Sequence, residues 1–245
     1  MNNSNTVRNT LKVLAVAMVT VVAFGCSKDD DGPNIEAPTL SYSDSDIEAT
    51  FHQSGNSAAP VVNWNGEEGT FSLTSAAVSG ISIDENTGVI SWENILSWGE
   101  HAITVTATNS AGSSSATVTL NNPFQGTFTG SYDWNYNGEI GTFGAFHTEM
   151  KFHLDGKVTG NILNVITMTG QPLAGNWEII DDEIYIEYVI DPADGTDRYS
   201  IAAEITITEE TVRIGTATRT ATIYEGFDAT PGTEVGDISI GLQQD

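Results

Sequence analysis

The sequence is poor in basic residues and almost free of cysteine. It has 8 Lys and Arg against 33 Asp and Glu, a formal net charge of −25 over 245 residues. Nucleic-acid binding needs a basic patch that neutralises phosphates, so this charge argues against nucleic acid as a partner. The single cysteine, Cys26, rules out an internal disulfide and a zinc site built from several thiolates. Hydrophobic residues still make up 39%, so the chain should fold into one or two domains.

Sequence signatures of common catalytic sites are missing as well. The chain has no G-x-S-x-G elbow, no H-E-x-x-H motif and no glycine-rich phosphate loop. The acidic pair Asp181-Asp182 is adjacent in sequence, so on a strand its carboxylates would point to opposite faces. We therefore expect that this protein is not an enzyme.

The N-terminal segment has the layout of a secretory signal peptide, which we assign to residues 1–25. This segment has no acidic residue, and Arg8 and Lys12 precede an apolar run over Val13–Phe24. As a helix the run would span about 18 Å, less than the roughly 30 Å of a bilayer core, so we expect no transmembrane anchor. Cleavage would remove both basic residues and leave 6 basic against 33 acidic residues, a net charge of −27.

The residues around the only cysteine resemble the lipobox of bacterial lipoproteins. The sequence Val-Ala-Phe-Gly-Cys occupies residues 22–26, with Gly25 directly before Cys26. Ala23 departs from the pattern, since such boxes usually carry Leu or Val at that place. The resemblance implies that Cys26 is lipidated and becomes the first residue of the mature chain. Several buried acyl chains would then hold the protein at a membrane.

A short acidic tether, residues 26–35, follows the proposed lipid anchor. Its Asp29–Asp31 run resembles the surface-export signal of some Gram-negative outer-membrane lipoproteins. The resemblance implies anchorage in the outer membrane and display at the cell surface. Alternatively, the run only keeps the tether solvated, because Asp, Gly and Pro do not pack a core.

The rest of the chain has an all-β pattern. From Pro38 onward no segment has a convincing 3.6-residue period, whereas short alternating runs of Val, Ile, Thr and aromatics recur between Gly, Asn, Asp and Ser. Asn121-Asn122-Pro123 ends a Thr/Val strand and cannot continue a central one. The sequence therefore predicts two β modules, residues 36–122 and 123–245.

The second half of the first module carries a specific pattern. Residues 80–90 read G-I-S-I-D-E-N-T-G-V-I and residues 104–112 read T-V-T-A-T-N-S-A-G, with Ile103, Val105 and Ala107 on one strand face. These segments resemble the immunoglobulin-like, cadherin-like modules of bacterial surface proteins. Trp92 departs from them, because members often have Gly there. The resemblance implies a β-sandwich that acts as a spacer or a binding unit rather than as a catalyst.

The second module opens with large side chains at even positions. Phe124, Phe128 and Tyr132 alternate with polar residues, so we expect them in a core. The same alternation predicts core positions at Phe146, Met150, Phe152 and Leu154, and at Ile184, Ile186, Tyr188 and Ile190.

Three later segments loosely resemble the lipocalin-like domains of bacterial lipoproteins. They are F-H-L-D-G at 152–156, G-N-W-E-I-I-D-D-E-I at 175–184, and Y-S-I-A-A-E-I-T at 199–206. The resemblance predicts an antiparallel eight-stranded barrel with an interior that is filled by side chains or sized for one ligand. A second β-sandwich is the alternative fold.

The end of the aromatic stripe is the candidate binding site, formed by Asp133, Trp134, Asn135, Tyr136 and Asn137. An aromatic ring can stack on the apolar face of a sugar while carboxylates and amides bond its hydroxyls. Asn137-Gly138 marks a turn, where neighbouring side chains tend to be exposed. The alternative is that both rings belong to the core.

Metal sites have weaker support. Asp191, Asp194 and Asp197 could offer oxygens to calcium, but their spacing differs from a helix-loop-helix site and also suits a hairpin turn. His147 and Glu149 would share one strand face about 6.5 Å apart. A metal ion could bridge them only with ligands from other strands, so we expect a solvated polar face instead. We expect no other cofactor.

These observations predict a lipid-anchored outer-membrane lipoprotein, displayed at the cell surface, that binds a glycan or another outer-membrane protein through its second module. A first alternative is a carrier of a small apolar molecule, with a cavity lined by Phe128, Tyr132, Met150, Phe152 and Ile186. A second is a purely structural surface protein.

Overall fold

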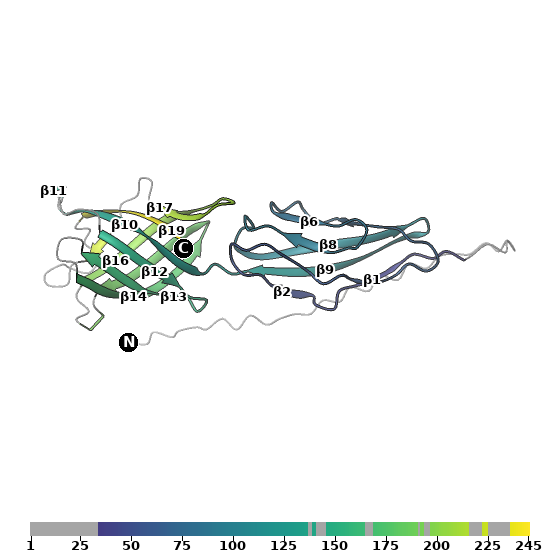
Figure 1. The fold of residues 1–245 in the computed structure, drawn as a ribbon, viewed down its shortest axis with the longest axis horizontal. Coiled ribbons are helices and arrows are strands. Elements are labelled where there is room, and N and C mark those ends of the chain that lie inside the picture. The colour runs from purple at the N-terminus through teal and green to yellow at the C-terminus, as the bar shows by residue number, and fades with distance from the viewer. Residues whose placement is uncertain are drawn as a thin grey trace, which may run out of the picture. The chain divides into compact units, whose positions relative to one another are not determined.

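A computed structural model describes residues 34–136, 139–140, 146–164, 169–190, 192–193, 197–215, 222–224 and 236–245 (Figure 1). The pattern of contacts within the chain divides it into two units, Met1–Pro33 and Asn34–Asp245. The predicted signal peptide, Cys26 and the tether up to residue 33 therefore lie outside the described residues. Within the described part, no helix is long and apolar enough to cross a membrane.

The first module is built from nine strands in three small sheets. Strands β2, β9, β8 and β5 form one sheet in that order, β3, β7 and β6 a second, and β1 and β4 a third. The strands are β1 Thr39–Ser41, β2 Asp46–Glu48, β3 Gly55–Asn56, β4 Val61–Asn63, β5 Thr70–Leu73, β6 Ile81–Ile83, β7 Ile90–Trp92, β8 Gly99–Asn109 and β9 Gly112–Asn122.

The core of this β-sandwich lies where the alternation of the sequence places it. Ile103, Val105 and Ala107 are at most 1% exposed and pack in one cluster with side chains of β5, β7 and β9. The prediction of this strand face is therefore confirmed. Trp92, the departure from the family pattern, is buried in the same cluster.

The second module is a closed antiparallel barrel. Each of its eight wall strands pairs with the next wall strand along the chain, in the order β10, β12, β13, β14, β15, β16, β17 and β19. Pairing of β10 with β19, from Phe128–Gln244 to Tyr136–Gly236, closes the wall. The predicted barrel is therefore confirmed, and the alternative of a second sandwich is wrong. Figure 1 shows the barrel strands running at a slant around a common axis.

The barrel strands are of unequal length, and two short strands flank them. β11 pairs with the end of β10, and β18 pairs with β16. The bounds are β10 Gly126–Tyr136, β11 Glu139–Ile140, β12 Phe146–Phe152, β13 Lys157–Asn164, β14 Thr169–Ile180, β15 Glu183–Ile190, β16 Asp197–Ile207, β17 Val212–Gly215, β18 Thr222–Tyr224 and β19 Gly236–Gln244.

Glycines at inward positions let the wall bend tightly. Gly160 lies between the buried Val158 and Ile162, and a Cβ added there would lie 1.9 Å from the backbone oxygen of Glu149 on β12. Cβ atoms at Gly130 and Gly175 would lie equally close, 2.0 and 1.9 Å, to a neighbouring strand's backbone oxygen. A small barrel needs such corners, because a side chain on the inside of a bend would collide with the next strand.

Three short turns lie at the end of the barrel where β10 begins. They join β12 to β13, β14 to β15, and β16 to β17. In the middle turn Asp181 and Asp182 have φ of 49° and 66°, which matches a two-residue hairpin with both residues left-handed. The pair forms the turn itself, so the argument about opposite strand faces does not apply to its carboxylates. β10 starts beside these turns and carries Tyr136 to the opposite end.

Candidate functional site

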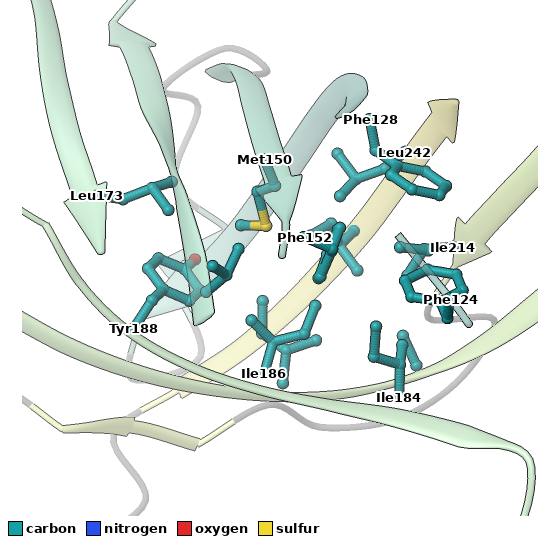
Figure 2. Packing of buried hydrophobic residues seen from close by; sticks show 14 of the residues in the cluster. Phe124, Phe128, Met150, Phe152, Leu173, Ile184, Ile186, Tyr188, Ile214 and Leu242 are labelled. Carbon is teal, nitrogen blue, oxygen red and sulfur yellow. The ribbon is translucent and has the colours of Figure 1, made fainter. Parts of the chain in front are cut away.

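The barrel interior is packed with apolar side chains from all eight wall strands. Phe128, Met150, Ile184 and Ile186 have no exposed surface, and Phe152 is 1% exposed. Figure 2 shows the labelled side chains converging inside the barrel from strands around its wall. All five belong to one continuous cluster. The core predictions for these residues are confirmed.

An aromatic floor fills the end of the barrel where the chain enters from β9. The ring of Phe124 lies 5.5 Å from Phe128, 5.5 Å from Phe152 and 5.3 Å from Trp177, measured between centroids. Trp177 also donates from Nε1 to the carbonyl oxygen of His153 at 3.1 Å. Tilted and offset ring pairs of this kind add about 0.5–1.5 kcal/mol each to the apolar burial.

Two positions in β12 and the turn after it differ from the sequence expectation. Leu154 is 63% exposed, so its assignment to the core is wrong. β12 ends at Phe152, so the alternation of inward and outward side chains stops there and does not reach Leu154. Thr148 takes an inward position with no exposed surface, and its hydroxyl donates to the carbonyl oxygen of Asn161 at 3.3 Å. The sequence did not indicate burial of Thr148, because a polar residue at this position does not suggest a place in the core.

The candidate platform lies on the barrel wall at the end opposite the floor. Asp133 to Tyr136 form the last residues of β10, where Trp134 pairs with Ile238 of β19 and Tyr136 pairs with both Glu139 and Gly236. The structure thus places the backbone of four of the five candidates at a rim, next to a hairpin between β10 and β11. Asn137 and the four side chains lie outside the described residues, as does the side chain of Tyr132.

Of the calcium candidates, the backbone of Asp197 lies at the same end of the barrel. Ile190 of β15 pairs with Asp197, the first residue of β16, so the connection between these strands is a hairpin. Asp191, Asp194 and the side chain of Asp197 lie outside the described residues. Elsewhere in the described part, no three His, Cys, Asp or Glu side chains come close enough to hold a metal ion.

The outer wall of β12 is polar, as the alternation predicts. His147 and Glu149 are both exposed, whereas the buried Met150 and Phe152 alternate with outward residues of the same strand. His153, farther along, is half-buried and bonds the hydroxyl of Thr159 at 2.8 Å.

Some acidic residues of the sandwich, among them Asp84 and Glu48, have hydrogen-bond partners within the fold. The carboxylate of Asp84 accepts from the backbone N–H groups of Asn86 and Thr87, both at 2.9 Å. The bonds from Thr87 and then Asn86 lower the pKa of Asp84. This carboxylate therefore stabilises the turn before β7. Glu48 similarly accepts from the amide of Asn121 at 2.8 Å.

A tyrosine fixes the other side of that turn. Tyr42 donates its hydroxyl to the carbonyl oxygen of Gly88 at 2.5 Å, across 46 residues of sequence. Gly88 has a φ of +69°, and a Cβ there would lie 2.7 Å from Pro60. Burial raises the pKa of Tyr42 to about 12, because the phenolate would lose solvation.

Comparison with known proteins identifies the first module only. Residues 33–123 match the family described as "Putative Ig domain". This match and the observed sheets confirm the immunoglobulin-like prediction for that part of the chain. No curated protein matches the sequence. The crystal structure of human protocadherin-24 EC1-2 is similar at 8% sequence identity and a TM-score of 0.38. The alignment covers 86% of this chain and 96% of the protocadherin chain, and so low a TM-score supports no functional conclusion.

Proposed function

We propose that the protein is a lipid-anchored outer-membrane lipoprotein, exposed at the cell surface, whose sandwich is a spacer and whose barrel binds a glycan or another surface protein. Binding requires no catalysis in this account. The observation that carries it is the position of the candidate platform. The strand with Trp134 and Tyr136 enters the barrel beside the link to the sandwich and ends at the opposite rim.

The sequence supports the anchor. Arg8 and Lys12 before an apolar run, with Gly25 and the only cysteine after it, form a signal and a lipobox-like end. Anionic membrane surfaces repel a chain with a net charge of −25. The lipid, rather than the charge of the protein, would therefore hold the chain at the membrane. The acidic run Asp29–Asp31 supports outward display.

Side-chain chemistry supports the glycan. Two aromatic rings, two asparagine amides and one carboxylate occur within residues 133–137. An indole or phenol ring can stack on a pyranose, while amides and carboxylates bond its hydroxyl groups. Strand residues beside a rim are rigidly placed by the wall, which lowers the entropy lost on binding.

A glycan array and a pull-down with the soluble chain from Ser27 onward test the binding role. We expect a sugar ligand, or recovery of one outer-membrane protein, and loss of that binding in Trp134→Ala and Tyr136→Ala. Tyr185→Ala, on the outward side of β15, is the matched control and should bind as the wild type does. Unchanged binding by both platform variants would remove the platform from the account.

The carrier remains the second candidate, because an eight-stranded barrel can enclose one small ligand. The closed pairing of β10 with β19 favours it, whereas the packing of Phe128, Met150, Phe152 and Ile186 in one buried cluster counts against a cavity there. Denaturing extraction of the purified chain and mass spectrometry would reveal a co-purified apolar molecule. Quenching by iodide separates the two candidates, since the glycan account requires that Trp134 reach solvent, and comparison with Trp134→Phe isolates its signal among the 5 tryptophans. The resemblance of the barrel segments to lipocalin-like domains supports this second proposal.

A further inference from the structure

One aromatic side chain of the sandwich segment is buried in the barrel's apolar cluster. Phe51 lies in the turn between β2 and β3, is 3% exposed, and belongs to the same cluster as Phe128 and Phe152. Its ring centroid lies 4.9 Å from that of Phe124. The barrel floor is therefore completed by a residue far from it in sequence.

Phe124 connects this side chain to the floor. It lies between β9 and β10, in a link of only three residues that begins with Pro123. It is 3% exposed and contacts rings from both sides, Phe51 at 4.9 Å and Trp177 at 5.3 Å. A proline and a fully buried aromatic leave such a link little conformational freedom.

Trp98 contributes a third ring. Its centroid lies 6.4 Å from Phe124 at an interplanar angle of 83°, within the range of an edge-to-face pair. Hydrogen bonds from a buried side chain hold the loop that contains Trp98. Asn122 donates from Nδ2 to the carbonyl oxygens of Leu96 at 2.9 Å and Ser97 at 3.0 Å.

Polar contacts connect the same segments independently of the rings. Asn94 donates from Nδ2 to the carbonyl oxygen of Glu209, in the turn between β16 and β17, at 2.7 Å. The carbonyl oxygen of Asn94 accepts in turn from Nδ1 of His52 at 3.0 Å. The residue next to Phe51 and the loop before Trp98 are thereby bound to each other and to a barrel turn.

We propose that the sandwich and the barrel tumble as one rigid unit through an aromatic joint, defined as Phe51, Trp98 and Phe124. Neighbouring domains move independently by default unless an apolar interface joins them. Here two of the three joint residues are buried to 97% and reach the barrel core from two different stretches of chain. The inference is independent of any ligand, and it means that the spacer would present the barrel in a fixed orientation.

Backbone amide relaxation by NMR on the full soluble chain, residues 27–245, tests the proposal directly. We expect that amides of the sandwich strands and of the barrel strands report one common rotational correlation time. Two separate values in the wild-type chain, each set by the size of one module, would overturn the proposal whatever any variant does.

Variants then test the joint itself. Phe51→Ala combined with Asn94→Ala removes one ring and one bridging hydrogen bond, and should lose the common value while both modules keep dispersed amide spectra. Val61→Ala, at a side chain that is 67% exposed on β4, is the control and should keep the common value. A common value that survives in the double variant would contradict the assignment of these residues as the joint. Loss of the sandwich or barrel spectrum would contradict the proposal that these residues join two modules that are each folded.

Discussion

Gly160→Ala tests whether close strand approach, rather than composition, shapes the barrel. The new Cβ would lie 1.9 Å from the carbonyl oxygen of Glu149, 2.9 Å from its carbonyl carbon and 3.1 Å from the Cα of Met150. Real Cβ atoms do not approach other atoms below 3.0 Å, so β12 would have to move by more than 1 Å. The obstacle is backbone, and β12 is paired on both sides, with β10 and β13.

The cost follows from two opposing effects. Overpacking a rigid core costs about 1–3 kcal/mol. Replacing Gly by Ala lowers the entropy of the unfolded chain and returns about 0.4–1 kcal/mol. We therefore expect a net loss of roughly 1–2 kcal/mol, or about 2–8 °C in melting temperature for a protein of this size.

Two other barrel glycines serve as matched controls. A Cβ at Gly170 or Gly241 would meet no atom within 4 Å, and neither glycine has a positive φ. Gly170→Ala and Gly241→Ala should therefore keep or raise stability by up to about 1 kcal/mol. Urea unfolding of the soluble chain, followed by circular dichroism, measures all three midpoints. Equal stability of Gly160→Ala and the controls would refute the argument from strand approach.

Two further predictions concern charge. Because burial raises the pKa of Tyr42 from 10.0 to about 12, the stability from keeping it neutral is present below pH 10 and is lost as the pH rises through about 12. Thermal melts should therefore fall less steeply over this range in Tyr42→Phe, and an unchanged slope would contradict the burial argument. Residues 36–122 contain 10 Asp and Glu and no Lys or Arg, so self-repulsion is uncompensated there. Raising NaCl from about 0.01 to about 0.5 M should raise the melting temperature by screening, and equal melts in both salts would contradict it.

The sequence predicted the two β modules because strand alternation is a local property. Ile184 and Ile186 are fully buried, as their period of two indicates. Leu154 marks the limit of this inference, since the alternation continued past the point where β12 ends and the side chain became exposed. Strand ends depend on hydrogen bonds to a partner strand, which one segment of sequence does not contain.

Contacts between distant segments could not be predicted in the same way. Phe51 has no periodic pattern around it, and only the folded chain brings it against Phe124. The sequence around Gly160 gives no sign that this residue allows two strands to approach, which only the folded barrel shows. The rim position of Trp134 was expected from Asn137-Gly138, and the pairing of β10 with β11 agrees with a hairpin there. The binding role of that position stays a prediction.

Lipid anchorage and surface display are tested most directly by protease digestion of intact cells that express the wild-type chain or Cys26→Ser. An antibody to the barrel follows the fate of the protein, and a periplasmic protein verifies that the envelope stays closed. We expect that the wild-type barrel is membrane-bound and digested from outside, whereas Cys26→Ser is absent from the membrane fraction. Protection of the wild-type chain until the outer membrane is opened would contradict surface display, and membrane retention of Cys26→Ser would contradict the lipid anchor.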